Sequence, residues 1–121
     1  MEPLSLQDLH HLAINHVGKE LEKQGFEFIA INSQLKKHPQ FVCVDKPTNT
    51  LHFVMVQAVT YPDNPADYDV LFMETFINHA KGKKAKVLYA GVGFANAEDF
   101  EKPVFKNQDY ILNYEGIKEI L

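Results

Sequence analysis

The stretch of sequence that decides the fold runs from Phe41 to Thr60 and reads FVCVDKPTNTLHFVMVQAVT. It contains two apolar runs, one from Phe41 to Val44 and one from Leu51 to Thr60. Between them, Asp45 to Asn49 supplies the Asp, Pro and Asn residues that favour tight turns. The pattern predicts a β-hairpin whose two strands are central in a sheet.

A helix and a strand are predicted before this hairpin. Ser5 and Asp8 have the spacing of an N-terminal capping box, and Gly25 has the character of a helix end. Phe26 to Ile31 is aromatic and β-branched, which predicts a buried strand, and a loop follows from Asn32 to Pro39. The predicted helix carries an apolar stripe at intervals of three and four residues, formed by Leu6, Leu9, Ala13, Val17 and Leu21.

A second helix is predicted after the hairpin. Tyr61 to Pro65 contains two prolines, which stop the preceding strand because proline lacks a backbone donor. Asp67 is the predicted N-cap of the helix, which should end near Gly82. Its apolar side chains include Leu71, Phe76 and Ile77.

The remaining chain predicts two strands and a terminal turn. Lys86 to Phe94 predicts a strand in which Gly91 and Gly93 indicate a bulge or a close backbone approach. Tyr110 to Tyr114 predicts a short strand, and Glu115 to Leu121 a last turn of helix. The whole order predicts a single α/β domain, residues 1–121, with a mixed central sheet of about five strands flanked by helices.

Composition excludes several classes of protein. Cys43 is the single cysteine, so the chain can form neither an internal disulfide nor a cysteine zinc site. Its place in an apolar run predicts an inert buried thiol. The net charge of −4 opposes bulk attraction to nucleic acid. With no leader-like or membrane-spanning apolar segment, we expect a cytoplasmic protein without membrane association.

Two small basic clusters are candidate phosphate contacts. Short runs of lysine also suit an ordinary solvated helix end, and this second interpretation is the more usual one. The clusters consist of Lys36 and Lys37, and of Lys81, Lys83, Lys84 and Lys86.

The first half of the chain carries a family resemblance. The helix that ends at Gly25 is followed by FEFIAIN over residues 26–32, and the second hairpin strand begins LHFVMVQ over residues 51–57. Together these segments resemble the small bacterial endonuclease-like proteins of the PD-(D/E)XK superfamily, over about half of the chain. The resemblance implies a restriction-endonuclease-like fold of three layers.

The resemblance also implies a degenerate active site. In that superfamily an aspartate and a glutamate hold a divalent ion that hydrolyses a phosphodiester, and a lysine supports the nucleophile. Neutral side chains cannot replace these ligands, so the resemblance implies no catalytic residue, no metal and no cofactor. The aspartate falls on Gln40, the glutamate on Met55, the lysine on Gln57, and a glutamate of the first helix on Ile14.

Other polar residues leave further possibilities open. His52, Gln57 and Asp45 are candidates for a polar pocket, because amides and imidazoles can recognise a base edge, a sugar or a peptide backbone. The spacing of the six histidines does not predict a metal site, and His52, beside the degenerate positions, is the most interesting of them. The six are His10, His11, His16, His38, His52 and His79.

The sequence thus supports three hypotheses of function. The first is a non-catalytic binding or assembly module with the nuclease fold, for which a homodimer and nucleic acid are the partners left open. The second is a divergent nuclease that uses Mg²⁺ or Mn²⁺ on migrated carboxylates, with Asp45, Glu20 and Glu74 as candidates. The third is an unrelated α+β ligand-binding domain.

Overall fold

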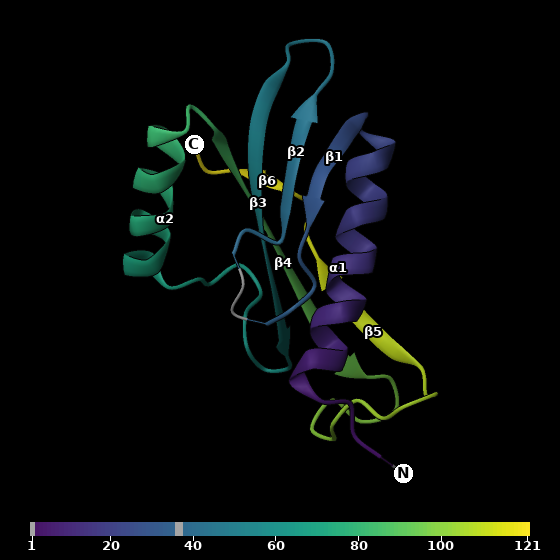
Figure 1. Ribbon diagram of the computed structural model, residues 1–121. Coiled ribbons are helices and arrows are strands. Elements are labelled where there is room, and N and C mark those ends of the chain that lie inside the picture. Colours follow the sequence, from purple (N-terminus) through teal and green to yellow (C-terminus); the bar gives the residue numbers. More distant parts are fainter. Residues whose placement is uncertain (1, 36–37) are drawn as a thin grey trace.

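The structure is a computed structural model that describes residues 2–35 and 38–121. In this part of the chain, a helix and three strands are followed by a second helix and three more strands (Figure 1). Lys36 and Lys37 lie outside the described residues. The elements are α1 (Leu6–Lys23), β1 (Phe26–Ile31), β2 (Phe41–Asp45), β3 (Thr50–Thr60), α2 (Val70–Gly82), β4 (Lys86–Asn96), β5 (Tyr110–Tyr114) and β6 (Lys118–Glu119).

The strands form one mixed sheet in the order β1-β2-β3-β4-β5, and β6 also pairs with β4. β1, β2 and β3 are successive antiparallel neighbours, whereas β3 and β4 are parallel. A parallel pair needs a long crossover connection, and α2 provides it. The predicted α/β class is therefore confirmed.

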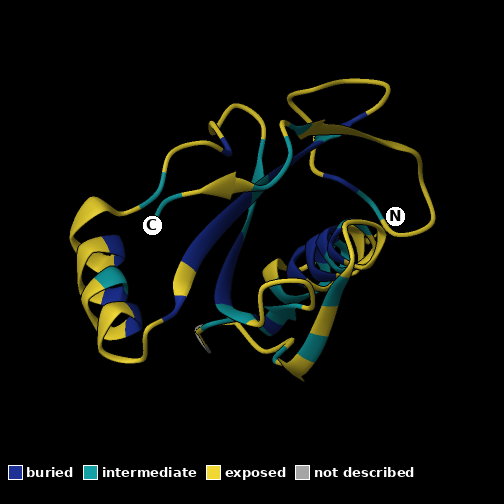
Figure 2. Ribbon diagram, turned by 90° about the horizontal axis from the view of Figure 1, so that it is seen from above, coloured by how far each residue is buried: buried dark blue, intermediate teal, exposed yellow. Residues whose placement is uncertain are grey.

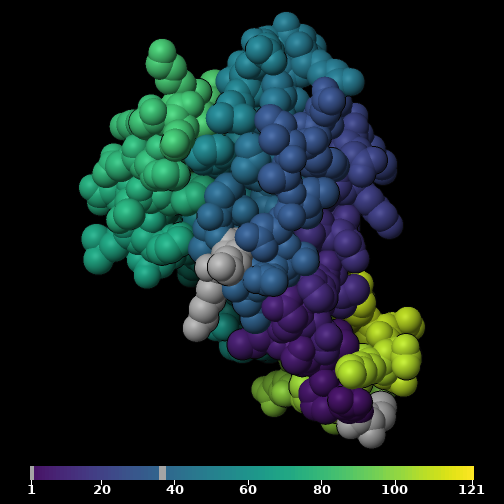
Figure 3. All heavy atoms as spheres, in the orientation of Figure 1, coloured from purple at the N-terminus to yellow at the C-terminus, as the bar shows by residue number. Residues whose placement is uncertain are grey.

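The two helices cover opposite faces of the sheet (Figures 1 and 2). Side chains along β3 alternate between the faces, so Val54 and Val56 belong to the core under α1, whereas Phe53 and Met55 belong to the core under α2. The space-filling view shows α2 on one side of the hairpin and α1 on the other (Figure 3). Neither of these helices is long and apolar enough to cross a membrane.

The predicted hairpin of β2 and β3 is confirmed. Phe41 pairs with Val54 and Asp45 with Thr50. The turn closes when the backbone nitrogen of Asn49 donates to the Asp45 carbonyl at 2.6 Å. Asn49 has a φ of 56°, a left-handed conformation that asparagine tolerates better than most residues.

The capping box predicted for α1 is also confirmed. The backbone nitrogen of Asp8 donates to Ser5 Oγ at 3.1 Å, and the backbone nitrogen of Ser5 donates to Asp8 Oδ2 at 2.9 Å. Hydrogen bonding of the Asp8 carboxylate to the Ser5 backbone, and to the Ser5 side chain, lowers the pKa of Asp8 below its ordinary value. The two bonds of the capping box satisfy backbone donors that the first turn of a helix leaves unpaired.

The cap of α2 is two residues later than predicted. Asp69, rather than Asp67, accepts a hydrogen bond from the backbone nitrogen of Phe72 through Oδ1 at 3.0 Å. The segment between β3 and α2 contains a local turn, in which Asn64 Oδ1 accepts a hydrogen bond from the backbone nitrogen of Ala66. This turn delays the start of the helix, so the prediction for Asp67 was wrong.

The prediction that β1 is buried was wrong. β1 is an edge strand with β2 as its neighbour, and Ile29 and Ile31 are 61% and 57% exposed. Phe26 and Phe28 point the other way and pack against the core under α1. The pairing of β1 with β2 also shifts register between Phe28 and Ala30, which leaves Ile29 in a bulge.

The predicted terminal turn of helix was also wrong. Lys118 and Glu119 form β6 instead, which pairs with Tyr89 and Leu88 of β4. The backbone nitrogen of Ile120 then donates to the Val87 carbonyl at 2.9 Å. In the described chain the sheet therefore has six strands, one more than the predicted count.

The close backbone approach predicted at Gly91 is confirmed. A Cβ atom at this position would lie 1.9 Å from the Pro65 carbonyl oxygen, which is far inside van der Waals contact. Tyr89 donates from its hydroxyl to the same oxygen at 2.6 Å, in a buried hydrogen bond. Gly91 is thus required by the path of the loop before α2.

We predict that Gly91→Ala lowers the free energy of unfolding by about 2 kcal/mol or more, because the new methyl group forces the Pro65 backbone to move. Urea unfolding measures the change. The control is Gly82→Ala, at a position with no atom within 4 Å of the added Cβ. It should be neutral or stabilise by up to about 1 kcal/mol. Equal midpoints for the two variants would contradict the prediction.

Candidate functional site: a cleft at the free edge of β3

A cleft of about 290 Å³ lies beside β3, just beyond the segment of this strand that pairs with β2. The β2 strand pairs with β3 from Thr50 to Val54, so the rest of β3 has no strand neighbour on this side within the described chain. The lining comes from α1, the loops before β2 and α2, β3 and the start of α2. It consists of His10, Leu35, His38, Met55, Val56, Gln57, Ala58, Tyr68, Asp69 and Phe72.

Gln40 continues the sheet at the inner end of the cleft. Its side chain is fully buried, and its backbone nitrogen donates to the Val54 carbonyl at 3.0 Å. Its Oε1 then accepts from the backbone nitrogen of Val56 at 2.7 Å. A side-chain amide thus occupies the place where the next backbone carbonyl of β2 would bond to β3. The resemblance assigned the metal-binding aspartate to this position.

The same amide fixes the tautomer of His38. Because the Val56 backbone nitrogen is a donor, the atom of Gln40 that faces it must be the oxygen. The Gln40 nitrogen therefore donates to His38 Nδ1, at 2.8 Å. His38 accepts at Nδ1 and carries its proton on Nε2. Its ring also contacts Phe72 edge-on, with the centroids 4.9 Å apart.

Met55 and Gln57 form part of the wall of the cleft. Met55 is 5% exposed and belongs to the core under α2. Gln57 donates from Nε2 to the Asp67 carbonyl at 2.7 Å, which fixes the orientation of the amide. Met55 and Gln57 thus line the cleft, and Gln40 lies behind it, bonded to the lining residues Val56 and His38.

Ile14 lies elsewhere. It is buried in the core under α1 and lines a different hollow, beside Phe28 and Phe41. The α1 residue that lines the cleft is His10, four positions earlier in the helix. The structure therefore does not bring Ile14 together with Met55 and Gln57 at the cleft.

His10 is the functional candidate that the sequence did not single out. It is 3% exposed, and among the described buried side chains its Nε2 is the atom without a hydrogen-bond partner. Burial lowers the pKa of His10 below its usual value, and the nearby His11 and His38 lower it further. Its spacing of four and seven residues from Ile14 and Val17 is the signal that could have placed it on the buried face.

His52 and Asp45 lie at the other end of the hairpin. His52 Nδ1 contacts the Thr50 carbonyl at 3.0 Å, and its ring meets Phe26 edge-on with centroids 4.9 Å apart. Gln57 is five residues further along β3, which corresponds to about 16 Å. The proposed set of His52, Gln57 and Asp45 therefore does not line one pocket.

The basic cluster after α2 lies away from the cleft. The cleft contains Phe72, in the first turn of α2, whereas Lys81 and Lys83 lie at its C-terminal end. A helix of 13 residues separates these ends by about 20 Å. Lys86 pairs with Glu119 at 3.0 Å, so part of the positive charge of the cluster is neutralised. Lys84 is exposed beside them.

The migrated carboxylates do not converge either. Glu20 accepts a hydrogen bond from the Tyr114 hydroxyl, and burial, together with this bond, raises the pKa of the tyrosine. Glu74 is exposed on α2, and Asp45 lies at the hairpin turn. In residues 2–35 and 38–121 there is no group of three or more His, Cys, Asp or Glu side chains that could hold a metal ion.

The prediction of an inert thiol at Cys43 agrees with the structure. Cys43 is completely buried in the core under α1, and burial raises its pKa to about 11. At neutral pH the thiol is therefore protonated, and a protonated thiol is a poor nucleophile and a poor metal ligand.

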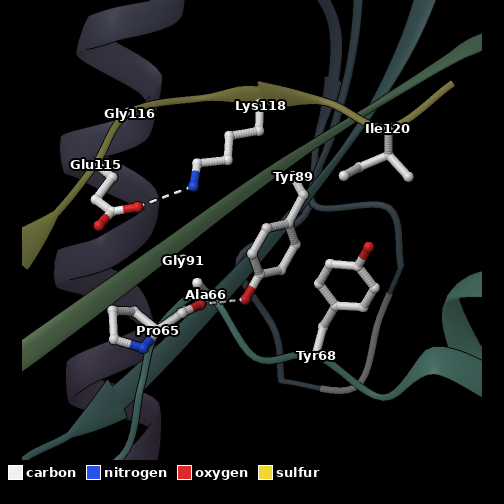
Figure 4. Close-up of a pocket in the computed structure, with 9 residues that line it drawn as sticks. All are labelled: Pro65, Ala66, Tyr68, Tyr89, Gly91, Glu115, Gly116, Lys118 and Ile120. Carbon is white, nitrogen blue, oxygen red and sulfur yellow. Dashed lines mark hydrogen bonds and ion pairs between the residues drawn. The ribbon is translucent and has the colours of Figure 1, made fainter.

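A second, smaller hollow lies beside Tyr68, which contributes to both (Figure 4). It measures about 170 Å³. Its polar groups bond to one another, since Tyr89 donates to the Pro65 carbonyl and Lys118 pairs with Glu115 at 2.8 Å (Figure 4). Burial raises the pKa of Tyr89 to about 12. This hollow offers a ligand fewer open polar groups than the cleft at β3.

The fold and the cleft define a three-layer α/β protein with a mostly apolar site that carries one carboxylate, Asp69. The chain matches the family described as Domain of unknown function (DUF8840) over residues 7–120, and it belongs to this family. No curated protein and no solved structure matches it.

We predict that His10 makes the stability depend on pH. The folded protein keeps His10 neutral, whereas the unfolded chain protonates it near its ordinary pKa of 6.5. The free energy of unfolding should therefore decrease as the pH falls below this value, by at most about 1.4 kcal/mol per pH unit, until the folded protein is protonated too. Urea unfolding between pH 7 and 5 measures this slope.

His10→Leu should reduce the slope, whereas His79→Leu, at an exposed position of α2, should leave it almost unchanged. Both substitutions remove one imidazole, so the comparison isolates the effect of burial. An identical slope in His10→Leu and the unmodified protein would show that His10 does not cause the effect.

Proposed function

We propose that this chain is a catalytically inactive protein of the restriction-endonuclease-like fold, and that it acts as a binding module through the cleft at β3. The helix, the first strand and the hairpin on which the resemblance rests are α1, β1, β2 and β3, in that order. Two of the three strand positions that would carry the chemistry, Met55 and Gln57, line the cleft, and the third, Gln40, hydrogen-bonds to lining residues. Their convergence supports a common ancestry with the nuclease site.

The two hydrogen bonds of the Gln40 side chain are the main support for the proposed loss of nuclease activity. A nuclease of this kind needs charged oxygen ligands to hold a metal ion and to activate water. The Gln40 oxygen is instead bonded to the Val56 backbone at 2.7 Å, and its nitrogen to His38 at 2.8 Å. Neither end of the amide is available to a metal, and the group is part of the sheet.

The charge of the cleft supports the same conclusion. Asp69 is the carboxylate among the lining residues, and one of its oxygens caps α2. A single, partly engaged carboxylate is a weak anchor for a magnesium ion, which is usually held by carboxylates together with substrate phosphates. The cleft instead has amide, imidazole and apolar surfaces, which suit recognition without catalysis.

We expect no hydrolysis of single- or double-stranded DNA or RNA by the purified protein, with Mg²⁺ or Mn²⁺ present, because the cleft lacks a set of metal ligands. Gel assays of end-labelled substrates measure cleavage, and titration calorimetry measures binding of Mn²⁺ alone.

Cleavage would contradict the proposal if it stayed with the protein through purification and disappeared in Asp69→Asn or Asp45→Ala. The first variant probes the cleft and the second probes the hairpin turn, where Asp45 is a candidate for a migrated carboxylate. Circular dichroism must show that both variants are folded.

A further inference from the structure

The cleft presents hydrogen-bond acceptors from two residues. Gln57 uses its nitrogen for the Asp67 carbonyl, so its oxygen is left as the open end of the amide. Asp69 uses Oδ1 for the backbone nitrogen of Phe72, which leaves Oδ2 as a charged acceptor. Both side chains are held by these bonds, so the acceptors are fixed before a ligand arrives.

Donors are present in the same cleft. His38 carries its proton on Nε2, because its Nδ1 accepts from Gln40. Backbone groups add to this set, since alternate residues of a strand point their N–H and C=O toward the same edge. Val54 and Val56 bond to Gln40 along this edge, so the N–H of Ala58 is directed to the same side, where no strand pairs with it in the described chain.

His10 belongs to the lining of the cleft, and its Nε2 is buried without a hydrogen-bond partner. Leaving a buried polar atom unsatisfied costs free energy, and such atoms are rare in folded proteins. This part of the cleft wall is therefore not optimised for stability alone.

The walls and the size of the cleft limit the ligand to one ring system. Tyr68, Phe72 and Leu35 supply aromatic and aliphatic surface, against which a flat ring can pack. The volume of about 290 Å³ is at the lower end of the range for ligand pockets. Asp69, in the same lining, would repel a phosphate.

We infer that the cleft binds a planar nitrogen heterocycle whose edge presents two adjacent N–H donors and one acceptor, as the pairing edge of guanine does. Gln57 and Asp69 accept from the ring N–H and the exocyclic amine, and His38 or the Ala58 amide donates to the carbonyl oxygen. This inference rests on the proposed binding role of the cleft. The base can come from a free nucleoside or from an unpaired position of a single strand.

The test compares three nucleosides that differ at this edge. Titration calorimetry of the full chain with guanosine should show binding. Inosine, which lacks the exocyclic amine, should bind roughly tenfold more weakly, because one bond to a charged acceptor is lost. Adenosine should bind more weakly still, because its pairing edge places an acceptor where guanine has a donor. Equal affinities for the three would overturn the inference.

Asp69→Asn is the sharpest variant. Asparagine is as good an N-cap as aspartate, so α2 keeps its cap, while the open acceptor becomes an amide donor. Guanosine affinity should fall roughly tenfold or more. The control Asp63→Asn makes the same change of charge at an exposed residue outside the cleft lining, and it should leave the affinity unchanged. Equal losses in both variants would overturn the inference.

Single-stranded oligonucleotides distinguish the two sources of the base. Tighter binding of a guanine-containing strand than of guanosine, with the same loss in Asp69→Asn, would support the inference and identify the strand as the source. Binding of guanosine alone would support a free nucleoside. If neither binds at millimolar concentration, the inference is overturned.

A different result, metal-dependent cleavage, would contradict the proposed function. The amide chemical shifts of Gln57, Ala58 and Asp69 report ligand binding at the cleft, so they separate the proposed binding role from the inference about guanine. If another class of compound shifts these signals and guanosine does not, the binding role of the cleft stands and the guanine inference falls.

Discussion

The hydrogen bond from the Val56 backbone to the Gln40 side chain is the constraint on which the cleft depends. A strand edge that lies inside a protein must find partners for its backbone groups, because burying them unpaired is costly. Gln40 precedes the first residue of β2, and its side-chain amide bonds to the β3 edge in place of a strand backbone. The same amide orders His38, and His38 contacts Phe72 at the start of α2. One neutral side chain thus connects the sheet, the loop before β2 and the second helix.

Local chemistry made much of the fold predictable. The hairpin, the capping box of α1 and the close approach at Gly91 depend on residues that are near in sequence or on a glycine that leaves few alternatives. The exposure of β1 and the strand at Lys118 depend on which strands become neighbours, and this is decided by contacts between distant parts of the chain. A run such as FEFIAI is equally compatible with a central and an edge position, so its burial could not be read from its composition.

The candidate site was predictable to the extent that it lies on the hairpin. Once Phe41 pairs with Val54, the antiparallel register brings Gln40 beside Met55 and Val56. The opposite wall comes from α1, which is far from β3 in the sequence, and from residues beyond the turn that follows β3, and the burial of His10 depends on how α1 packs on the sheet. For this reason the sequence did not single out His10 among the six histidines. It favoured His52 instead, because that residue lies on the hairpin, but in the structure His52 packs against Phe26.

The bulge at Ile29 has a consequence for how molecules of this protein meet. An open edge strand with two exposed isoleucines is a template for the addition of a strand from another chain. The register shift between Phe28 and Ala30 interrupts the regular spacing of donors and acceptors along β1. An incoming strand can therefore match only part of this edge at a time, which protects a concentrated solution from sheet-to-sheet polymerisation while the apolar side chains stay exposed.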